Sequence, residues 1–187
     1  DNFILPPVIK ESIYKADPKN KGHITVYLPA YRDNILENYL LPLKEFEFQV
    51  FSAQKSQLEK KANISFIPIN QSMFNESLIN CQGIVTGAGF ETPAEALHLG
   101  KKLLAIPING QYEQQCNAAA LAQMGIDTLT GLHDNFTESF YQWVSKPVAA
   151  TNLSGYSTGE IVNKLMCQSL HPYKQELDFL YPDFVIG

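Results

Sequence analysis

The chain has 187 residues, of which 45% are hydrophobic and 18% are charged, a balance typical of one globular domain with a substantial core. Its formal net charge is -5 and it has no lysine- and arginine-rich block, so we expect no nucleic-acid partner. No apolar run is long enough to span a bilayer. The three cysteines lie far apart, which gives no metal-site spacing and fits a reduced compartment. We therefore expect a cytoplasmic location, with the inner face of the membrane as the alternative.

Strands and helices alternate from His23 onward. Residues 24–28 are β-branched and aromatic and predict a strand that stops at Pro29, and Asp33 is expected to cap the helix that follows. The same patterns predict further strands at residues 46–51, 64–67, 83–86, 103–106 and 127–129. They predict further helices at residues 73–79, 93–99, 112–124, 134–144 and 158–167.

Strands separated by helices imply a doubly wound α/β fold, Rossmann-like, in which helices cover both faces of a parallel sheet. We expect this domain over residues 23–170, between an entry or linker segment (1–22) and an aromatic, proline-broken C-terminal tail (171–187). Ligands of such sheets bind beyond the carboxyl ends of the strands, where the strand order reverses. A ligand site is therefore expected among the loops at residues 29–34, 68–72, 86–92 and 107–114.

The turn after the strand that ends at residue 86 is rich in glycine. Gly87 and Gly89 let the backbone approach a ligand without a Cβ clash. Thr92 is placed to cap the next helix, with Pro93 at its first position and Glu95 where a capping box puts its carboxylate. Such a helix start presents free N–H groups and a positive dipole end, which suits a diphosphate. The alternative is a turn that binds nothing, with Glu95 explained by capping alone.

A second polar cluster follows the strand at residues 103–106. Glu113, Gln114 and Asn117 lie on the first turns of the next helix, so they should border the same crevice. Carboxylate and amide groups there can hydrogen-bond the hydroxyls of a sugar. The alternative is a solvent-facing helix start at which Glu113 favours the dipole. Arg32 is a further candidate for a phosphate contact, and a solvated loop arginine is an equal alternative.

Together the two clusters resemble the C-terminal, donor-binding domain of the GT-B glycosyltransferases. The matching pattern is Gly89-x-x-Thr92-x-x-Glu95-Ala-Leu-x-x-Gly100, then Pro107, then Glu113-Gln114-x-x-Asn117-Ala118. It is most similar to the branch that holds the peptidoglycan N-acetylglucosaminyltransferase and the UDP-glycosyltransferases. The alternation of strands and helices over residues 23–167 also fits that domain.

The resemblance implies a role for each matching position at the glycine turn. Glu95 matches the acid that holds the ribose hydroxyls of UDP. Gly89 and the amides near Thr92 match the cradle of the diphosphate, in a turn that includes Gly87 and Phe90. The plant-type members carry a histidine at the position of Gly87 and an asparagine at the position of the residue that precedes Thr92.

The remaining matching positions concern the donor sugar and the uracil, and one position departs from the family pattern. Glu113 and Gln114 match the pair that grips the donor sugar, with Asn117 beside them. Ile67, in the stretch at residues 66–68, matches the segment that packs against the uracil. The departure is Glu91, whose carboxylate would repel a diphosphate at close range unless it points away or is paired.

The implied activity is transfer of a sugar from a nucleotide diphosphate, with UDP as the expected nucleotide, to an unknown acceptor. In the resembled family the acceptor-activating base usually comes from an N-terminal domain, so no catalytic residue is assigned and the chain is expected to be inactive alone. No cofactor and no metal are expected. The expected partners are the nucleotide-sugar donor and that N-terminal domain, and a peripheral membrane acceptor is compatible with this interpretation. Two alternatives stay open, a sugar-nucleotide epimerase of the same architecture and a non-enzymatic domain that has lost its donor.

Overall fold

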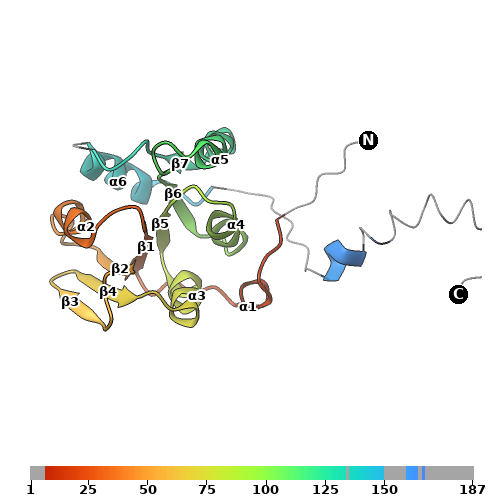
Figure 1. The fold of residues 1–187 in the computed structure, drawn as a ribbon, viewed down its shortest axis with the longest axis horizontal. Helices are drawn as coiled ribbons and strands as arrows, with labels where there is room; N and C mark the ends of the chain where they lie inside the picture. Colours follow the sequence, from red (N-terminus) through yellow and green to blue (C-terminus); the bar gives the residue numbers. More distant parts are fainter. Residues whose placement is uncertain (1–6, 134, 150–158, 164–165, 167–187) are drawn as a thin grey trace, which may run out of the picture.

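One twisted sheet forms the centre of the protein. The structure, a computed structural model, describes residues 7–133, 135–149, 159–163 and 166 (Figure 1). In these residues seven strands pair in the order β3-β4-β2-β1-β5-β6-β7, and every pairing is parallel except that of β3 with β4. The strands are β1 (His23–Tyr27), β2 (Glu47–Ser52), β3 (Glu59–Lys61), β4 (Ile64–Pro68), β5 (Gly83–Thr86), β6 (Lys102–Ala105) and β7 (Asp127–Thr128).

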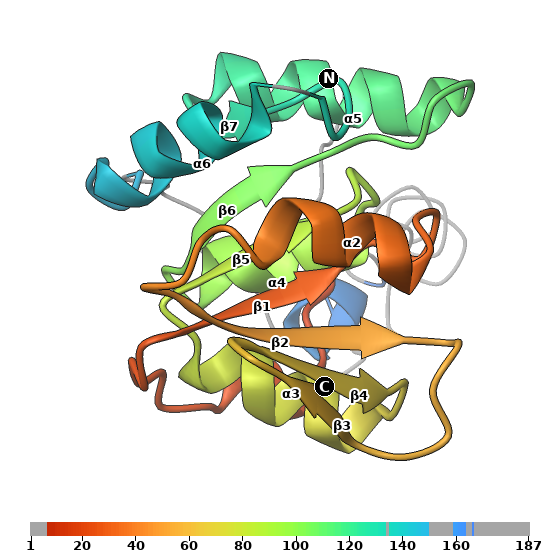
Figure 2. The same ribbon diagram turned by 90° about the vertical axis from the view of Figure 1, so that its left-hand side faces the viewer.

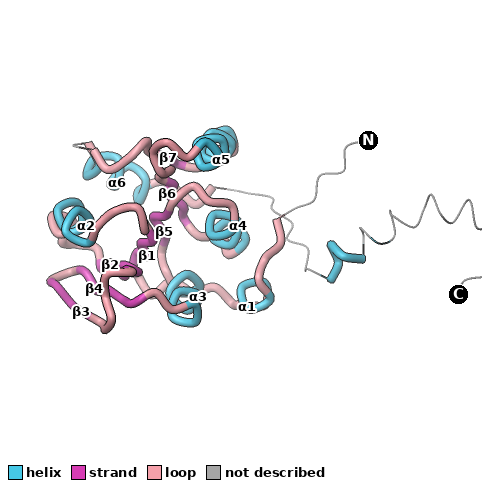
Figure 3. Tube along the Cα trace, in the orientation of Figure 1, coloured by secondary structure: helices cyan, strands magenta, loops and turns pink. Residues whose placement is uncertain are grey.

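Helices cover both faces of this sheet (Figure 3). They are α1 (Glu11–Tyr14), α2 (Asp33–Leu40), α3 (Gln71–Asn80), α4 (Glu91–His98), α5 (Tyr112–Gln123) and α6 (Phe136–Ser145). Helices α2 and α6 lie on one face, and α2 crosses in front of the strands in Figure 2. Helices α1, α3, α4 and α5 lie on the other face. The predicted fold class, a doubly wound α/β sheet, is confirmed.

The hydrophobic core is divided in two by the sheet. Successive strand residues point to opposite faces, so Ile84 packs with α3 and α4 whereas Val85 packs with α2 and α6. The face of α2 and α6 is rich in aromatic side chains, of which Phe136, Phe140 and Trp143 come from α6. Because both faces are covered, β1 and β5 are nearly continuous runs of buried residues.

The strand order reverses between β1 and β5. From β1 the chain builds outward through β2 and β4, and from β5 it builds in the other direction through β6 and β7. The carboxyl ends of β1 and β5 therefore border the crevice at which ligands of this fold bind. The glycine turn that follows β5 opens directly into this crevice.

The segment before β1 is part of the packed structure. Within the predicted entry segment 1–22, Ile9 and Ile13 are 2% and 0% exposed and belong to the core cluster of α3 and α4. The predicted tail at residues 171–187 lies outside the described residues, as does most of the second half of the predicted helix 158–167. None of the described helices is both long and apolar enough to cross a membrane.

Several local predictions were wrong. Thr92 is not an N-cap, because the chain is already helical at Phe90 (φ -87°, ψ -46°) and α4 begins at Glu91. Pro93 is the third residue of α4 and not the first, a position at which a proline still removes only an amide without an intrahelical acceptor. The Glu95 side chain makes no capping hydrogen bond among the described residues. Asp33 is the first residue of α2 and not its cap. Strand β3 was missed because its three residues are exposed and charged, with no apolar alternation.

Candidate functional site

Three strand-to-helix loops meet in one pocket at the reversal point of the sheet. The pocket has a volume of about 110 Å³. The loop after β1 lines it with Pro29 and Tyr31, the turn after β5 with Gly87 and Thr92, and the loop after β6 with Ile108 and Gln114. Three of the four loops in which the sequence placed a ligand site therefore converge at one position.

Side-chain amides of α5 bind the turn after β5 and the loop after β6. Asn117 Nδ2 donates to Ala88 O at 3.1 Å, which ties α5 to the glycine turn. Gln114 Oε1 accepts from Ile108 N at 3.0 Å. A Cβ added at Gly87 would lie 3.3 Å from Gln114 Oε1, so the glycine allows this close approach. Gln114 and Asn117 thus shape the pocket.

Open space lies in front of Gly89. No atom of the described residues lies within 4 Å of a Cβ built on this glycine. The helix that follows, α4, has no side-chain hydrogen bond at its cap among the described residues. Because Pro93 has no N–H, the first-turn groups that could bind an anion in this space are the amides of Glu91 and Thr92, which make no backbone hydrogen bond among the described residues. Thr92 lines the pocket from the first turn of the same helix.

Two carboxylates on α4 share one lysine that sequence reasoning did not single out. Lys10 Nζ lies 2.8 Å from Glu91 Oε1 and 3.4 Å from Glu95 Oε1. The charge of Glu91 is thus paired, which meets the condition under which it does not repel a diphosphate. Lys10 lies in the predicted entry segment, and no local spacing relates it to α4, so the sequence carries no signal for this contact.

The carboxylate of Glu95 is completely buried. Its side chain is 0% exposed, and among the described residues neither of its oxygens has a hydrogen-bond partner. Burial raises the pKa of the Glu95 carboxyl above its usual range, and the charge of Lys10 opposes this shift. Partial burial lowers the pKa of Lys10, but its contacts with Glu91 and Glu95 outweigh this and raise it overall. The Glu95 carboxylate therefore faces Lys10 and not solvent.

The remaining predicted site residues lie in different places. Phe90 and Glu113 are exposed at the carboxyl edge of the sheet: Phe90 directly precedes α4, and Glu113 lies on the first turn of α5. Arg32 is exposed and directly precedes α2. Ile67 does not line the pocket at the reversal point. It belongs to β4 and borders a separate hollow of about 300 Å³ beside α3, together with His23.

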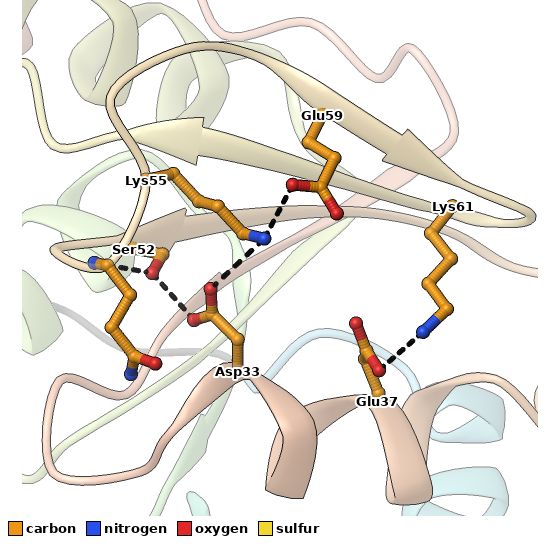
Figure 4. Close-up of polar contacts among 7 residues, drawn as sticks. Asp33, Glu37, Ser52, Lys55, Glu59 and Lys61 are labelled. Carbon is orange, nitrogen blue, oxygen red and sulfur yellow. Dashed lines mark hydrogen bonds and ion pairs between the residues drawn. The ribbon is translucent and has the colours of Figure 1, made fainter.

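The first turn of α2 carries its own anion (Figure 4). The buried carboxylate of Asp33 accepts a hydrogen bond from Ser52 Oγ at 2.6 Å and lies 3.8 Å from Lys55 Nζ. Lys55 also binds Glu59 of β3 at 2.6 Å. Asp33 is thus a buried carboxylate in the first turn of α2, where the positive end of the helix dipole favours its charge. Among the described residues no cluster of His, Cys, Asp and Glu could hold a metal ion.

Comparison with known proteins gives one family and a set of similar folds. The model of the family described as "Glycosyl transferase family 1" matches residues 1–145. The spinosyn forosaminyltransferase SpnP matches with a TM-score of 0.60 and 17% identity, over 88% of this chain and 48% of that one. The glycosyltransferase VinC, solved in complex with dTDP, matches with a TM-score of 0.59 and 16% identity, over 87% of this chain and 44% of that one.

A third solved structure also resembles this chain. MurG of Acinetobacter baumannii matches with a TM-score of 0.56 and 16% identity, over 87% of this chain and 54% of that one. The chain therefore spans about half the length of the solved structures that it matches. No curated protein sequence matches it. At these identities the solved structures establish the fold alone.

Proposed function

Because the chain belongs to glycosyl transferase family 1, we propose that it forms the donor-binding half of a two-domain GT-B glycosyltransferase. The enzyme would move a sugar from a nucleotide diphosphate to an acceptor. The bond between the anomeric carbon and the diphosphate oxygen breaks, the acceptor oxygen bonds to that carbon and loses its proton, and the nucleotide diphosphate leaves with the negative charge. The acceptor and the group that takes its proton would come from the other half of the protein.

One observation carries this proposal: the open space at Gly89 lies at the free amino end of α4, inside the crevice where the strand order reverses. A diphosphate there would accept hydrogen bonds from the amides of the glycine turn and of the first turn of α4. These groups are already in position, so they would stabilise the charge that develops on the leaving diphosphate. Lys10 keeps Glu91 from opposing that charge.

The ribose and the sugar would bind on either side of the diphosphate. We assign the ribose hydroxyls to Glu95, which lies one helical turn into α4. We assign the sugar to the exposed carboxylate of Glu113 and to Gln114, at the start of α5. Contact between Glu95 and a ribose requires the Lys10 side chain to leave the carboxylate, since the Glu95 side chain is 0% exposed and lies against Lys10.

We propose UDP as the nucleotide. Its ribose carries a 2′-hydroxyl that a deoxyribose lacks, and this difference makes the proposal testable. VinC holds dTDP, whose sugar lacks the 2′-hydroxyl. A carboxylate that accepts from both the 2′- and the 3′-hydroxyl binds a ribose better than a deoxyribose. If Glu95 reads the ribose, the chain should bind UDP more tightly than dTDP, and Glu95→Gln should reduce this preference.

Calorimetric titration of the chain with UDP and dTDP tests the proposal. We expect saturable binding of UDP, which Glu95→Gln weakens by about tenfold or more through the loss of a charge-assisted hydrogen bond. A matched control is Glu138→Gln, which changes an exposed carboxylate on α6, away from the crevice. No heat of binding with either nucleotide at millimolar concentration would refute donor binding.

The burial of Glu95 beneath Lys10 favours one competing function, a domain that has lost its donor. A domain that had lost its donor would keep the fold and would have no need of an accessible ribose-binding acid. The same titration separates the two, because such a domain binds neither nucleotide. A sugar-nucleotide epimerase would bind UDP as well, and it is separated by product analysis of the full-length protein, in which free epimer and transferred sugar differ.

A further inference from the structure

The carboxylate of Glu95, on α4, has an unusual environment. Glu95 is a fully buried carboxylate whose two oxygens have no hydrogen bond among the described residues. Buried carboxylates are normally hydrogen-bonded, because an unpaired one is costly in a medium of low polarity. The ammonium group of Lys10 lies 3.4 Å from one of these oxygens, and both this group and the backbone amide of Lys10 favour the charged form, against the burial that raises the pKa of the Glu95 carboxyl. Glu95 therefore has unused capacity to accept hydrogen bonds.

Lys10 is held over Glu95 from the solvent side. Its shorter contact, 2.8 Å, is with Glu91, whose side chain is 60% exposed. The Lys10 side chain is itself 31% exposed, so its ammonium lies between a solvated carboxylate and a buried one. An ion pair at such a position is partly screened by water and is easily exchanged.

The part that can move is the Lys10 side chain and not the segment that carries it. The neighbouring Ile9 and Ile13 are buried in the core cluster of α3 and α4. Tyr14, at the end of α1, stacks on His98 of α4 with ring centroids 5.3 Å apart. Displacing the segment would expose both isoleucines, whereas rotation of the flexible lysine side chain about its own bonds exposes little apolar surface.

We propose that Lys10 is a gate on the nucleoside site, whose ammonium occupies the place of the ribose hydroxyls on Glu95 until a ligand displaces it. This gate rests on the proposed function, because it requires Glu95 to be the ribose-binding acid. Lys10 and the ribose compete for the same oxygens, so the lysine weakens binding of the nucleoside. After displacement the ammonium stays paired with Glu91, so Lys10 remains close to the site.

Titration with uridine tests the gate, because a nucleoside without phosphates makes no charge contact with the lysine. Lys10→Met removes the ammonium but keeps a side chain of similar length, and we expect it to tighten uridine binding about threefold to tenfold. Lys10→Arg keeps the charge and should bind uridine as the unchanged chain does. Lys15→Met is the control, since this lysine lies on the same segment and pairs with Glu11 on the surface.

A measurement on the unchanged chain keeps the test independent of how well the variants fold. Amine labelling followed by mass spectrometry should show faster modification of Lys10 when uridine is saturating, and no change at Lys15. Equal labelling of Lys10 with and without uridine would overturn the gate. So would unchanged or weaker uridine binding by Lys10→Met.

The two proposals fail in different ways. If Glu95→Gln weakens uridine binding while Lys10→Met leaves it unchanged, the gate is wrong and the ribose role of Glu95 stands. If neither the unchanged chain nor Lys10→Met binds uridine or UDP, the proposed function is wrong, and the gate with it.

Discussion

Replacing Gly89 by alanine separates a ligand-binding glycine from a structural one. The φ angle of Gly89 lies outside the left-handed region, and no atom of the described residues lies within 4 Å of the added Cβ. The folded protein should therefore accept the methyl group without strain. Since alanine reduces the freedom of the unfolded chain, the free energy of unfolding should stay constant or rise by about 0.4–1 kcal/mol.

Binding should respond in the opposite direction. The methyl group would occupy the space through which a diphosphate reaches the amides of the turn. A hydrogen bond to a charged group contributes about 1.5–3 kcal/mol, and about 1.4 kcal/mol corresponds to a tenfold change in affinity. Loss of one such bond should weaken UDP binding about tenfold to about a hundredfold. Uridine, which has no diphosphate, should bind Gly89→Ala almost unchanged.

The assay combines calorimetric titration with UDP and uridine and thermal unfolding of the same samples. The expected pattern is a melting temperature that is unchanged or higher, together with a selective loss of UDP affinity. Equal UDP affinity in Gly89→Ala and the unchanged chain would refute the assignment of this turn to the diphosphate. A large fall in melting temperature would show instead that the space at Gly89 serves the fold.

Two further substitutions give complementary results. Gly100 follows α4 at the edge of the sheet opposite the pocket, and a Cβ added there also meets open space, but its φ of +64° strains an alanine. We expect Gly100→Ala to lower the free energy of unfolding by roughly 1 kcal/mol and to leave UDP affinity unchanged. Thermal unfolding and calorimetric titration check this. Burial raises the pKa of Glu95 in the folded state above its ordinary value of 4.5, so the folded chain holds this proton more tightly than the unfolded chain does. The contribution of Glu95 to stability is therefore greatest below 4.5 and is lost as the pH rises through its raised folded value. Glutamine does not titrate, so Glu95→Gln should not lose stability in this way as the pH rises above 4.5. The melting temperature of the variant should therefore rise relative to that of the unchanged chain over this pH range, and a difference that stays constant with pH would contradict the reasoning.

The charged cluster beside α2 shows why local patterns have limits (Figure 4). Asp33 was expected to act as a cap from its position before an apolar helical pattern. In the fold it lies opposite Ser52 and Lys55, which arrive from the end of β2 and the loop beyond. The parallel pairing of β1 with β2 brings these residues together. No spacing along the chain predicts such a contact.

What the sequence determined by itself is the set of elements and the edge at which a ligand site forms. Strands of period 2 and helices of period 3.6 are local patterns, and a parallel sheet follows once they alternate. Gly87 and Gly89 mark the turn because only glycine permits a close backbone approach without a Cβ.

Only the tertiary structure decided which charges meet and which site residues share a pocket. Glu95 and Lys10 are far apart in the chain, and their contact depends on Ile9 and Ile13 packing the entry segment against α3 and α4. Ile67 was expected near the nucleotide and lines another hollow. Local periodicity records which face of an element is apolar, whereas side-chain pairing across elements depends on how those faces pack, and no single segment of the sequence contains that information.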